Sequence, residues 1–193
     1  MLNLSPPRTP VPRSSKKEYA LKVAYHLVTE CGGADGLTFD SLAEATGMSK
    51  PGLIYHFPSR HDLLIELHRY AARLWERELL RQSGGRAPED LTPAERERAL
   101  VVALEREEPL AEILLNIQAL SHRDYERAWD EIDERWLLDP SEDVESEDDL
   151  DRLEDHVLSA GLWVYNHLSG RPISEANRAK LVARLVARAE ARG

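Results

Sequence analysis

Cysteine is almost absent from this chain of 193 residues, since Cys31 is the only one. A lone cysteine cannot form an internal disulfide, and such a composition is typical of a cytoplasmic protein. Long hydrophobic runs are also missing. The longest unbroken apolar stretch covers residues 99–104, far fewer than the roughly 20 residues that a membrane-spanning helix needs. No signal-peptide pattern begins the chain, so we expect neither secretion nor a membrane span.

Net positive charge is lacking too. The formal charge of -10 argues at first against a nucleic-acid partner, because phosphate binding needs a basic surface. The charge is unevenly distributed, however. Residues 1–60 carry seven Lys or Arg against five Asp or Glu, which is +2, and the remaining residues carry 18 bases and 30 acids, which is -12. The sequence therefore predicts two parts with different electrostatic roles.

Alternating β-branched runs with hairpin turn signals do not occur, so we expect an all-α fold without an internal repeat. Capping residues followed by apolar stripes of helical period predict about nine helices. Their expected ranges are 16–31, 38–46, 49–57, 59–84, 92–107, 110–120, 124–138, 150–168 and 174–191.

Three segments are expected along the chain. Residues 1–15 contain four prolines together with Arg8 and Arg13 and predict a flexible basic arm. Residues 16–58 predict a small N-terminal three-helix domain, and residues 59–193 a larger helical domain. Cys31 continues the apolar stripe of the first helix, which predicts burial. The acidic run 139–155 is interpreted as a solvated connection.

The spacing within residues 38–57 is typical of a helix-turn-helix. Ala43 allows two helices to approach, Gly47 stands where the chain must turn, and Leu53 packs the second helix onto the first. The exposed first turn of the second helix is the part that meets base edges in the major groove. Hydroxyls, charges and amphipathic rings of the kinds that contact phosphate surround it.

The string TFDSLAEATGMSKPGLIYHFPSRHDLL at 38–64 resembles the signature of the TetR family of transcriptional regulators. The resemblance implies a repressor that binds a palindromic double-stranded operator as a homodimer and is released by a small-molecule inducer. It also implies that residues 16–58 are the helix-turn-helix DNA-binding domain and residues 59–193 the regulatory domain for ligand binding and dimerisation. Many members have Tyr where this chain has Ile54. The implied DNA contacts are Thr38, Ser49, Lys50, Pro51, Gly52, Tyr55, His56 and Arg60.

Aromatic and apolar residues on the later helices could line a ligand pocket, although such stripes are more often simply core. The stretches 52–61, Trp75 and 121–129 resemble a multidrug-binding subgroup of the same family, which implies small aromatic ligands, cationic ones included. Indole faces stack well on such ligands. The candidate ligand-binding residues are Trp75, Leu79, Leu104, Leu115, Asn116, Trp129 and Trp136.

The last two predicted helices are apolar nearly all round, which favours burial against a second copy as well as against their own domain. Gly161 would allow close helix approach. The family resemblance places a four-helix dimer interface here. The candidate interface residues are Val157, Gly161, Val164, Leu168, Leu181 and Leu185.

Catalytic motifs for nucleophilic, phosphate-binding or metalloprotease chemistry are absent, so we expect no enzyme and no cofactor. His56, His61 and His68 do not share one helical face and predict no metal site. Two alternatives stay open: a repressor that responds to a cellular metabolite, and an all-α ligand-binding protein that does not bind DNA.

Overall fold

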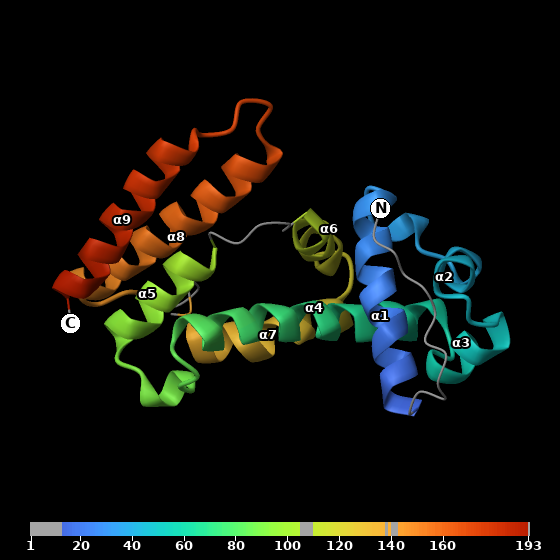
Figure 1. Ribbon diagram of the computed structural model, residues 1–193. Coiled ribbons are helices and arrows are strands. Elements are labelled where there is room, and N and C mark those ends of the chain that lie inside the picture. The colour runs from blue at the N-terminus through green and yellow to red at the C-terminus, as the bar shows by residue number, and fades with distance from the viewer. Residues whose placement is uncertain (1–12, 105–109, 138, 140–142, 193) are drawn as a thin grey trace. The chain divides into compact units, whose positions relative to one another are not determined.

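Helices form all the regular structure of the described residues, which contain no strand, as predicted (Figure 1). The computed structural model describes residues 13–104, 110–137, 139 and 143–192. The α-helices are α1 (Arg13–Glu30), α2 (Phe39–Thr46), α3 (Lys50–His56), α4 (Arg60–Gln82), α5 (Pro93–Ala103), α6 (Leu110–Ala119), α7 (Arg123–Trp136), α8 (Glu147–Leu168) and α9 (Glu175–Ala191). Two short 3-10 turns, Ala34–Gly36 and Pro88–Asp90, lie between them.

Side-chain caps begin several of these helices where the sequence predicts them. The Thr38 hydroxyl accepts the backbone N–H of Ser41 at 3.0 Å and begins α2. Thr92 and Glu95 form a reciprocal capping box at the start of α5. Each such cap satisfies a backbone N–H that the helix leaves unpaired, which is worth about 1 kcal/mol.

The first compact unit contains residues 13–73 and 110–129 of the described chain. In it α1 packs against α2, α3 and α6, and α2 packs against α3. Fully buried aliphatic and aromatic side chains of this unit form its core, among them Val28, Leu42, Leu53, Phe57, Leu67 and Leu115.

The second compact unit contains residues 74–104, 130–137, 139 and 143–192 of the described chain. Its α5 packs mainly on α9 and also on α8, while α8 and α9 lie side by side (Figure 1). Both units are discontinuous in sequence, because α4 and α7 each contribute residues to both. The predicted domains 16–58 and 59–193 are each one continuous segment. The compact units are not, so their boundaries differ from the predicted domain boundary.

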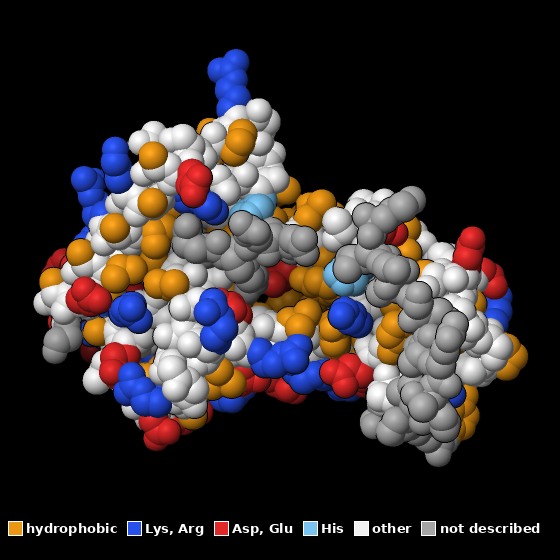
Figure 2. All heavy atoms as spheres, viewed as in Figure 1, with side chains coloured by type: hydrophobic (Ala, Val, Ile, Leu, Met, Phe, Trp, Pro, Cys, Tyr) orange, Lys and Arg blue, Asp and Glu red, His pale blue; other side chains and the backbone are white. Residues whose placement is uncertain are grey.

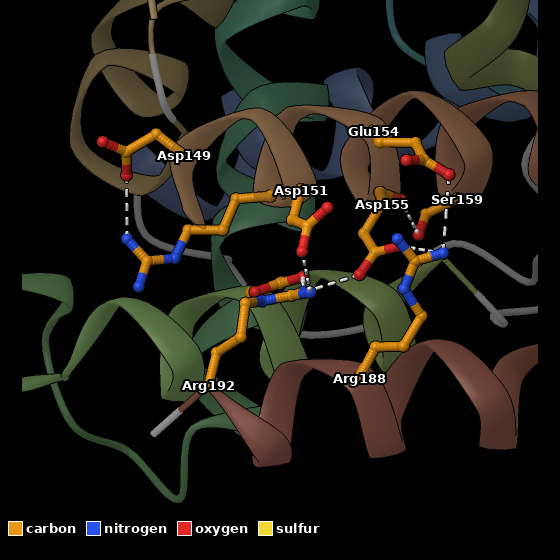
Figure 3. A network of polar contacts seen from close by, with 9 residues as sticks. Asp149, Asp151, Glu154, Asp155, Ser159, Arg188 and Arg192 are labelled. Atoms are coloured by element: carbon orange, nitrogen blue, oxygen red, sulfur yellow. Dashed lines mark hydrogen bonds and ion pairs between the residues drawn. The ribbon is translucent and has the colours of Figure 1, made fainter. Parts of the chain in front are cut away.

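An arginine–carboxylate network joins α5, α8 and α9 inside the second unit (Figure 3). Arg192 pairs with Glu97 of α5 and with Asp155 of α8, the latter at 2.6 Å. Arg188 reaches the other oxygen of Asp155 at 3.1 Å. Asp155 is fully buried, and buried carboxylates are tolerated when paired in this way.

Most of the described residues of the acidic run are exposed, as the prediction of a solvated segment requires, but the run is more than a connection. Its second half is helical, because α8 begins at Glu147, and the run ends at buried Asp155. The Ser146 hydroxyl caps this helix by accepting the Asp149 N–H at 3.1 Å. Three acidic residues occupy the first turn, where negative charge complements the helix dipole.

The predicted burial of Cys31 is wrong, since the thiol is exposed. The reason is that α1 ends at Glu30, one residue before the cysteine, and the chain turns through Gly32 and Gly33 with positive φ angles. The predicted arm lies mostly outside the described residues, and α1 already includes residues 13–15. None of the described helices is long and apolar enough to cross a membrane.

Candidate DNA-binding and ligand-binding sites

The turn between α2 and α3 has the geometry that the sequence predicts. Gly47 has a left-handed φ of 68°, which glycine adopts without steric cost, and its N–H closes α2 on the Ala43 carbonyl at 2.9 Å. Leu53 of α3 is fully buried. The two helices therefore form a helix-turn-helix in which the first turn of α3 is exposed.

The predicted hydroxyl contacts are both engaged in capping. Ser49 Oγ accepts the backbone N–H of Gly52 at 3.2 Å, as Thr38 does for Ser41 at the start of α2. Pro51 is exposed and Gly52 is half-buried, so the backbone of this turn approaches the surface. Phosphate is a common partner for such N-terminal amides.

Lys50 lies at the start of α3 and forms an ion pair with Asp40 of α2, with Nζ 2.9 Å from both carboxylate oxygens. Both side chains are exposed, so solvent screens this pair and it contributes little stability. Lys50 can therefore leave Asp40 for another anion at small cost.

Arg60 is used inside the first unit. Its Nε donates to the Leu37 carbonyl at 3.1 Å, and Nη2 donates to the Ala34 carbonyl at 2.7 Å. A longer bond of 3.4 Å reaches the carbonyl of Asp35. The guanidinium thus connects the start of α4 to the turn before α2. The sequence analysis predicted Arg60 as a DNA contact and did not predict this structural role.

Tyr55 and His56 complete the predicted DNA-binding set at the end of α3. The Tyr55 side chain is 56% exposed, and its ring meets that of His56 edge to face with centroids 5.4 Å apart. Ile54 is also exposed, at 42%. The structure therefore brings Lys50, Pro51, Tyr55 and His56 together on the short helix α3.

The predicted ligand-binding residues are divided between the two units. Leu115, Asn116 and Trp129 belong to the first unit. The second unit holds Trp75, Leu79, Leu104 and Trp136. The three tryptophans and both Leu79 and Leu115 are buried, as core side chains are, whereas Leu104 and Asn116 are half-buried.

A cavity of about 300 Å³ lies within the second unit, among α5, α7 and α8. Of the predicted ligand-binding residues, Trp136 lines it. The Trp136 Nε1 and Arg152 Nε atoms are buried and have no hydrogen-bond partner among the described residues. Further lining side chains are Glu97, Leu100, Val101, Leu137, Leu153 and His156.

Burial shifts the protonation of two groups at this cavity. It raises the pKa of Glu97 to about 7, against the opposing attraction of Arg192. Burial also lowers the pKa of His156, so its imidazole is neutral at pH 7. The cavity thus combines an apolar wall with donors that could bind an acceptor group.

His68 is a buried polar centre of the first unit, although the sequence analysis did not include it among the candidate site residues. Trp129 donates its indole N–H to His68 Nδ1 at 3.1 Å. His68 Nε2 therefore carries the proton and donates to Gln118 Oε1 at 3.2 Å. Tyr125 stacks on the imidazole, and burial lowers the His68 pKa to about 4. No short sequence motif indicates this arrangement, because Gln118 and Trp129 are 50 and 61 residues from His68.

A second cluster that the sequence did not indicate consists of His61, His122 and Asp124 in the first unit. One ligand atom from each side chain lies within 4.8 Å of the other two. The close spacing of His122 and Asp124 was the one sign of this cluster in the sequence. His61 is distant in sequence, so its proximity to them could not be predicted.

The predicted dimer residues lie on α8 and α9, where hydrophobic side chains are exposed (Figure 2). Val157, Val164 and Leu168 of α8 are exposed by 40% or more, and so is Leu181 of α9. Gly161 is exposed, and a side chain at this position would meet no described residue within 4 Å beyond its chain neighbours and the backbone of its own helix. Leu185 differs, because it is buried within its own unit.

The described residues form an all-helical fold with a helix-turn-helix, an arrangement typical of DNA-binding domains. The family model "Bacterial regulatory proteins, tetR family" matches residues 21–67. Residues 21–67 therefore match the model of the family that the string at 38–64 resembles. No match was found among curated proteins.

Solved structures of such regulators share the fold over most of both chains. A member of the TetR family from Streptomyces coelicolor is 19% identical, with TM-score 0.57, and the match covers 91% of this chain and 98% of that one. A candidate regulator from Saccharomonospora viridis in complex with choline is 18% identical, with TM-score 0.66 and coverage of 89% and 94%. The multidrug binding protein EbrR complexed with ethidium is 20% identical, with TM-score 0.57 and coverage of 88% and 97%.

Proposed function

We propose that this protein is a ligand-responsive transcription regulator that binds a palindromic operator as a dimer and is released from it by a small molecule. The observation that carries the proposal is the helix-turn-helix of α2 and α3, which lies within the matched TetR domain. The proposed division of labour is DNA binding by residues 16–58 and regulation by residues 59–193.

The exposed face of α3 supports DNA binding. Lys50 offers a cation held only by a solvent-exposed pair, and Tyr55 offers a hydroxyl and a ring. Pro51 and Gly52 bring the backbone of the first turn of α3 to the surface. Arg60 acts in our proposal mainly by holding α4 to the turn at residues 34–37.

Dimerisation through α8 and α9 supports operator recognition. A dimer presents two copies of α3 to half-sites about 34 Å apart, one turn of B-DNA. The exposed apolar side chains of α8 and α9 offer the apolar area that such an interface buries.

For the ligand we propose a small aromatic compound, cationic ones included. The similar protein EbrR forms complexes with ethidium and with proflavin, and the Saccharomonospora protein forms one with choline. Binding would stabilise a conformation whose recognition helices are wrongly spaced for DNA. A coupling of about 1 to 3 kcal/mol would change operator affinity roughly 5- to 150-fold.

A metabolite with a carboxylate or carbonyl group is the second candidate. The unpartnered donors Trp136 Nε1 and Arg152 Nε at the cavity favour it, because an acceptor would satisfy them. Titration of tryptophan fluorescence with ethidium and with small carboxylic acids separates the two ligand classes.

A mobility-shift assay on the DNA flanking the protein's own gene tests DNA binding. We expect a shift that Lys50→Ala and Tyr55→Ala weaken, with the salt slope of Lys50→Ala reduced by about 0.9 for one lost phosphate contact. Lys22→Ala removes the same charge from the exposed face of α1 and serves as the control. A correctly folded protein that binds no DNA there, or is equally weakened by Lys22→Ala, would contradict the proposal.

A further inference from the structure

Two histidines and one aspartate meet where α4 begins and α7 begins, within the first unit. His61 lies in the first turn of α4, His122 precedes α7, and Asp124 is in its first turn. This position is distinct from the DNA-binding face of α3 and from the cavity of the second unit. None of the three side chains has a part in the function proposed above.

The distances among these groups suit a tetrahedral metal ion. His61 Nε2 lies 3.3 Å from Asp124 Oδ2, and His122 Nδ1 lies 3.5 Å from the same oxygen. An ion bound tetrahedrally at 2.0 to 2.1 Å holds neighbouring donor atoms about 3.3 to 3.4 Å apart. Both distances to Asp124 Oδ2 are near that separation, and one ligand atom from each of the three side chains lies within 4.8 Å of the other two.

The surroundings fix two of these side chains in place. Tyr125 Oη lies 2.9 Å from His61 Nδ1, the ring nitrogen that faces away from Asp124. A hydrogen bond at the second nitrogen is the usual support for a metal-binding histidine. Arg127 Nη1 lies 3.5 Å from Asp124 Oδ1, so the other carboxylate oxygen, Oδ2, is the one near the histidines.

His122 is held by its own loop. The Asp124 backbone N–H donates to His122 Nδ1 at 3.2 Å, and the two imidazole rings of the cluster meet with centroids 4.5 Å apart. An ion at that nitrogen would replace the backbone bond. All three side chains are between 40% and 48% exposed, so water can complete the coordination.

We propose that His61, His122 and Asp124 form a binding site for a divalent transition-metal ion of the zinc class. Two imidazoles and one carboxylate are donors that suit zinc, and three protein ligands with one water make a four-coordinate site. Bound metal links the first turn of α4, which closely follows the end of α3, to the turn before α7. The ion therefore restrains the segment that carries the recognition helix.

Isothermal titration of the untagged full-length protein with Zn²⁺, and visible absorption after addition of Co²⁺, test this site. We expect about one ion per chain and tetrahedral Co²⁺ bands that Zn²⁺ abolishes. His61→Ala, His122→Ala and Asp124→Asn each remove the bands. Tyr125→Phe keeps the three ligands, removes the oxygen that supports His61, and lowers affinity by roughly 10-fold or more.

His167→Ala is the matched control, since His167 lies on α8 in the other unit and bonds the Trp163 carbonyl. This variant should bind the metal like the wild type. Circular dichroism verifies that each variant is folded. A folded wild type that binds no Zn²⁺, or metal binding that survives both histidine substitutions or is lost equally in His167→Ala, would overturn the proposal and leave a hydrogen-bonded cluster only.

Discussion

At the scale of single residues, His68 connects α4 to α6 and α7 by accepting the Trp129 indole N–H and donating to Gln118. Both bonds require the neutral imidazole with its proton on Nε2. Protonation of Nδ1 would place its N–H next to the Trp129 indole N–H in a buried site, where two donors repel each other. Burial accordingly lowers the His68 pKa to about 4.

We predict that His68 makes the protein sensitive to acid. Its folded pKa lies below the unfolded value of about 6.5, so the unfolded state binds more protons between these values and stability falls as the pH drops through this window. The loss should be about 2 kcal/mol at pH 5, which follows from about 1.4 kcal/mol per unit of pKa. Urea unfolding at pH 7.5 and pH 5 measures it.

The comparison variant for this measurement is His68→Gln, which can accept and donate but does not titrate. We expect its stability to change with pH by about 2 kcal/mol less than that of the wild type. An identical pH dependence in both proteins would show that His68 is not the titrating group.

Arg60 offers a second prediction at this scale, because it donates to carbonyl groups 23 to 26 residues away. Arg60→Ala should lower the free energy of unfolding by about 1 to 2 kcal/mol, since charge-assisted bonds to three carbonyls are lost from a partly exposed site. Arg69→Ala, which loses an exposed pair with Glu66 on the same helix, should cost well under 1 kcal/mol. Equal losses in urea unfolding would show that the Arg60 bonds contribute no more than a surface pair.

At the scale of helices, the network around Arg192 joins three elements of the second unit (Figure 3). Arg192 stands between Glu97 and Asp155, and all three side chains are at least 90% buried. Removing the arginine leaves two buried carboxylates, and Arg188 still pairs with Asp155. Glu97 then loses the cation that offsets its burial.

We predict that Arg192→Met destabilises the second unit by about 3 to 5 kcal/mol, the usual cost of breaking a buried ion pair. Adding Glu97→Gln should restore part of this loss, because the double variant no longer buries an unpaired carboxylate there. Arg184→Met, on the exposed face of α9, is the control and should change stability by less than about 0.5 kcal/mol. Thermal unfolding compares the four proteins, and a double variant no more stable than Arg192→Met would refute the network's role.

The helices themselves were largely predictable, because local signals determine where they begin and end. Thr38, Ser49 and Thr92 cap the helices that follow them, and Gly47 provides the left-handed turn. The contacts between helices were not predictable in the same way. Arg60 with residues 34–37, and His61 with Asp124, depend on tertiary packing and have no sequence period. Cys31 shows that an apolar stripe of helical period does not by itself locate the end of a helix, since the stripe includes Cys31 but α1 ends at Glu30.

At the scale of the whole molecule, the chain divides into two units to which α4 and α7 both contribute. The candidate DNA contacts and the proposed metal site belong to the first unit, and the cavity and the apolar face of α8 and α9 to the second. The backbone of each of these two helices continues from one unit into the other. Continuous domain boundaries drawn from sequence could not indicate this division.

Assembly should depend on the exposed apolar face of α8. Val164 and Leu168 on α8 are exposed apolar side chains one helical turn apart, and a second copy that covers them would bury both. Val164→Glu with Leu168→Glu should place four carboxylates in the dimer interface, two from each chain. Like charges without partners are costly there, so light scattering after size exclusion should report a monomer.

Loss of the dimer should also weaken DNA binding. A monomer binds one half-site and loses the affinity gained from linked binding of two half-sites, which is about 100-fold or more. Leu120→Glu is the control for adding charge at an exposed apolar position, since Leu120 is 79% exposed and follows α6 in the first unit. It should stay dimeric and keep its operator affinity. A double variant that remains dimeric would place the interface elsewhere, whereas a monomer with undiminished affinity would mean that one copy of α3 suffices for the operator.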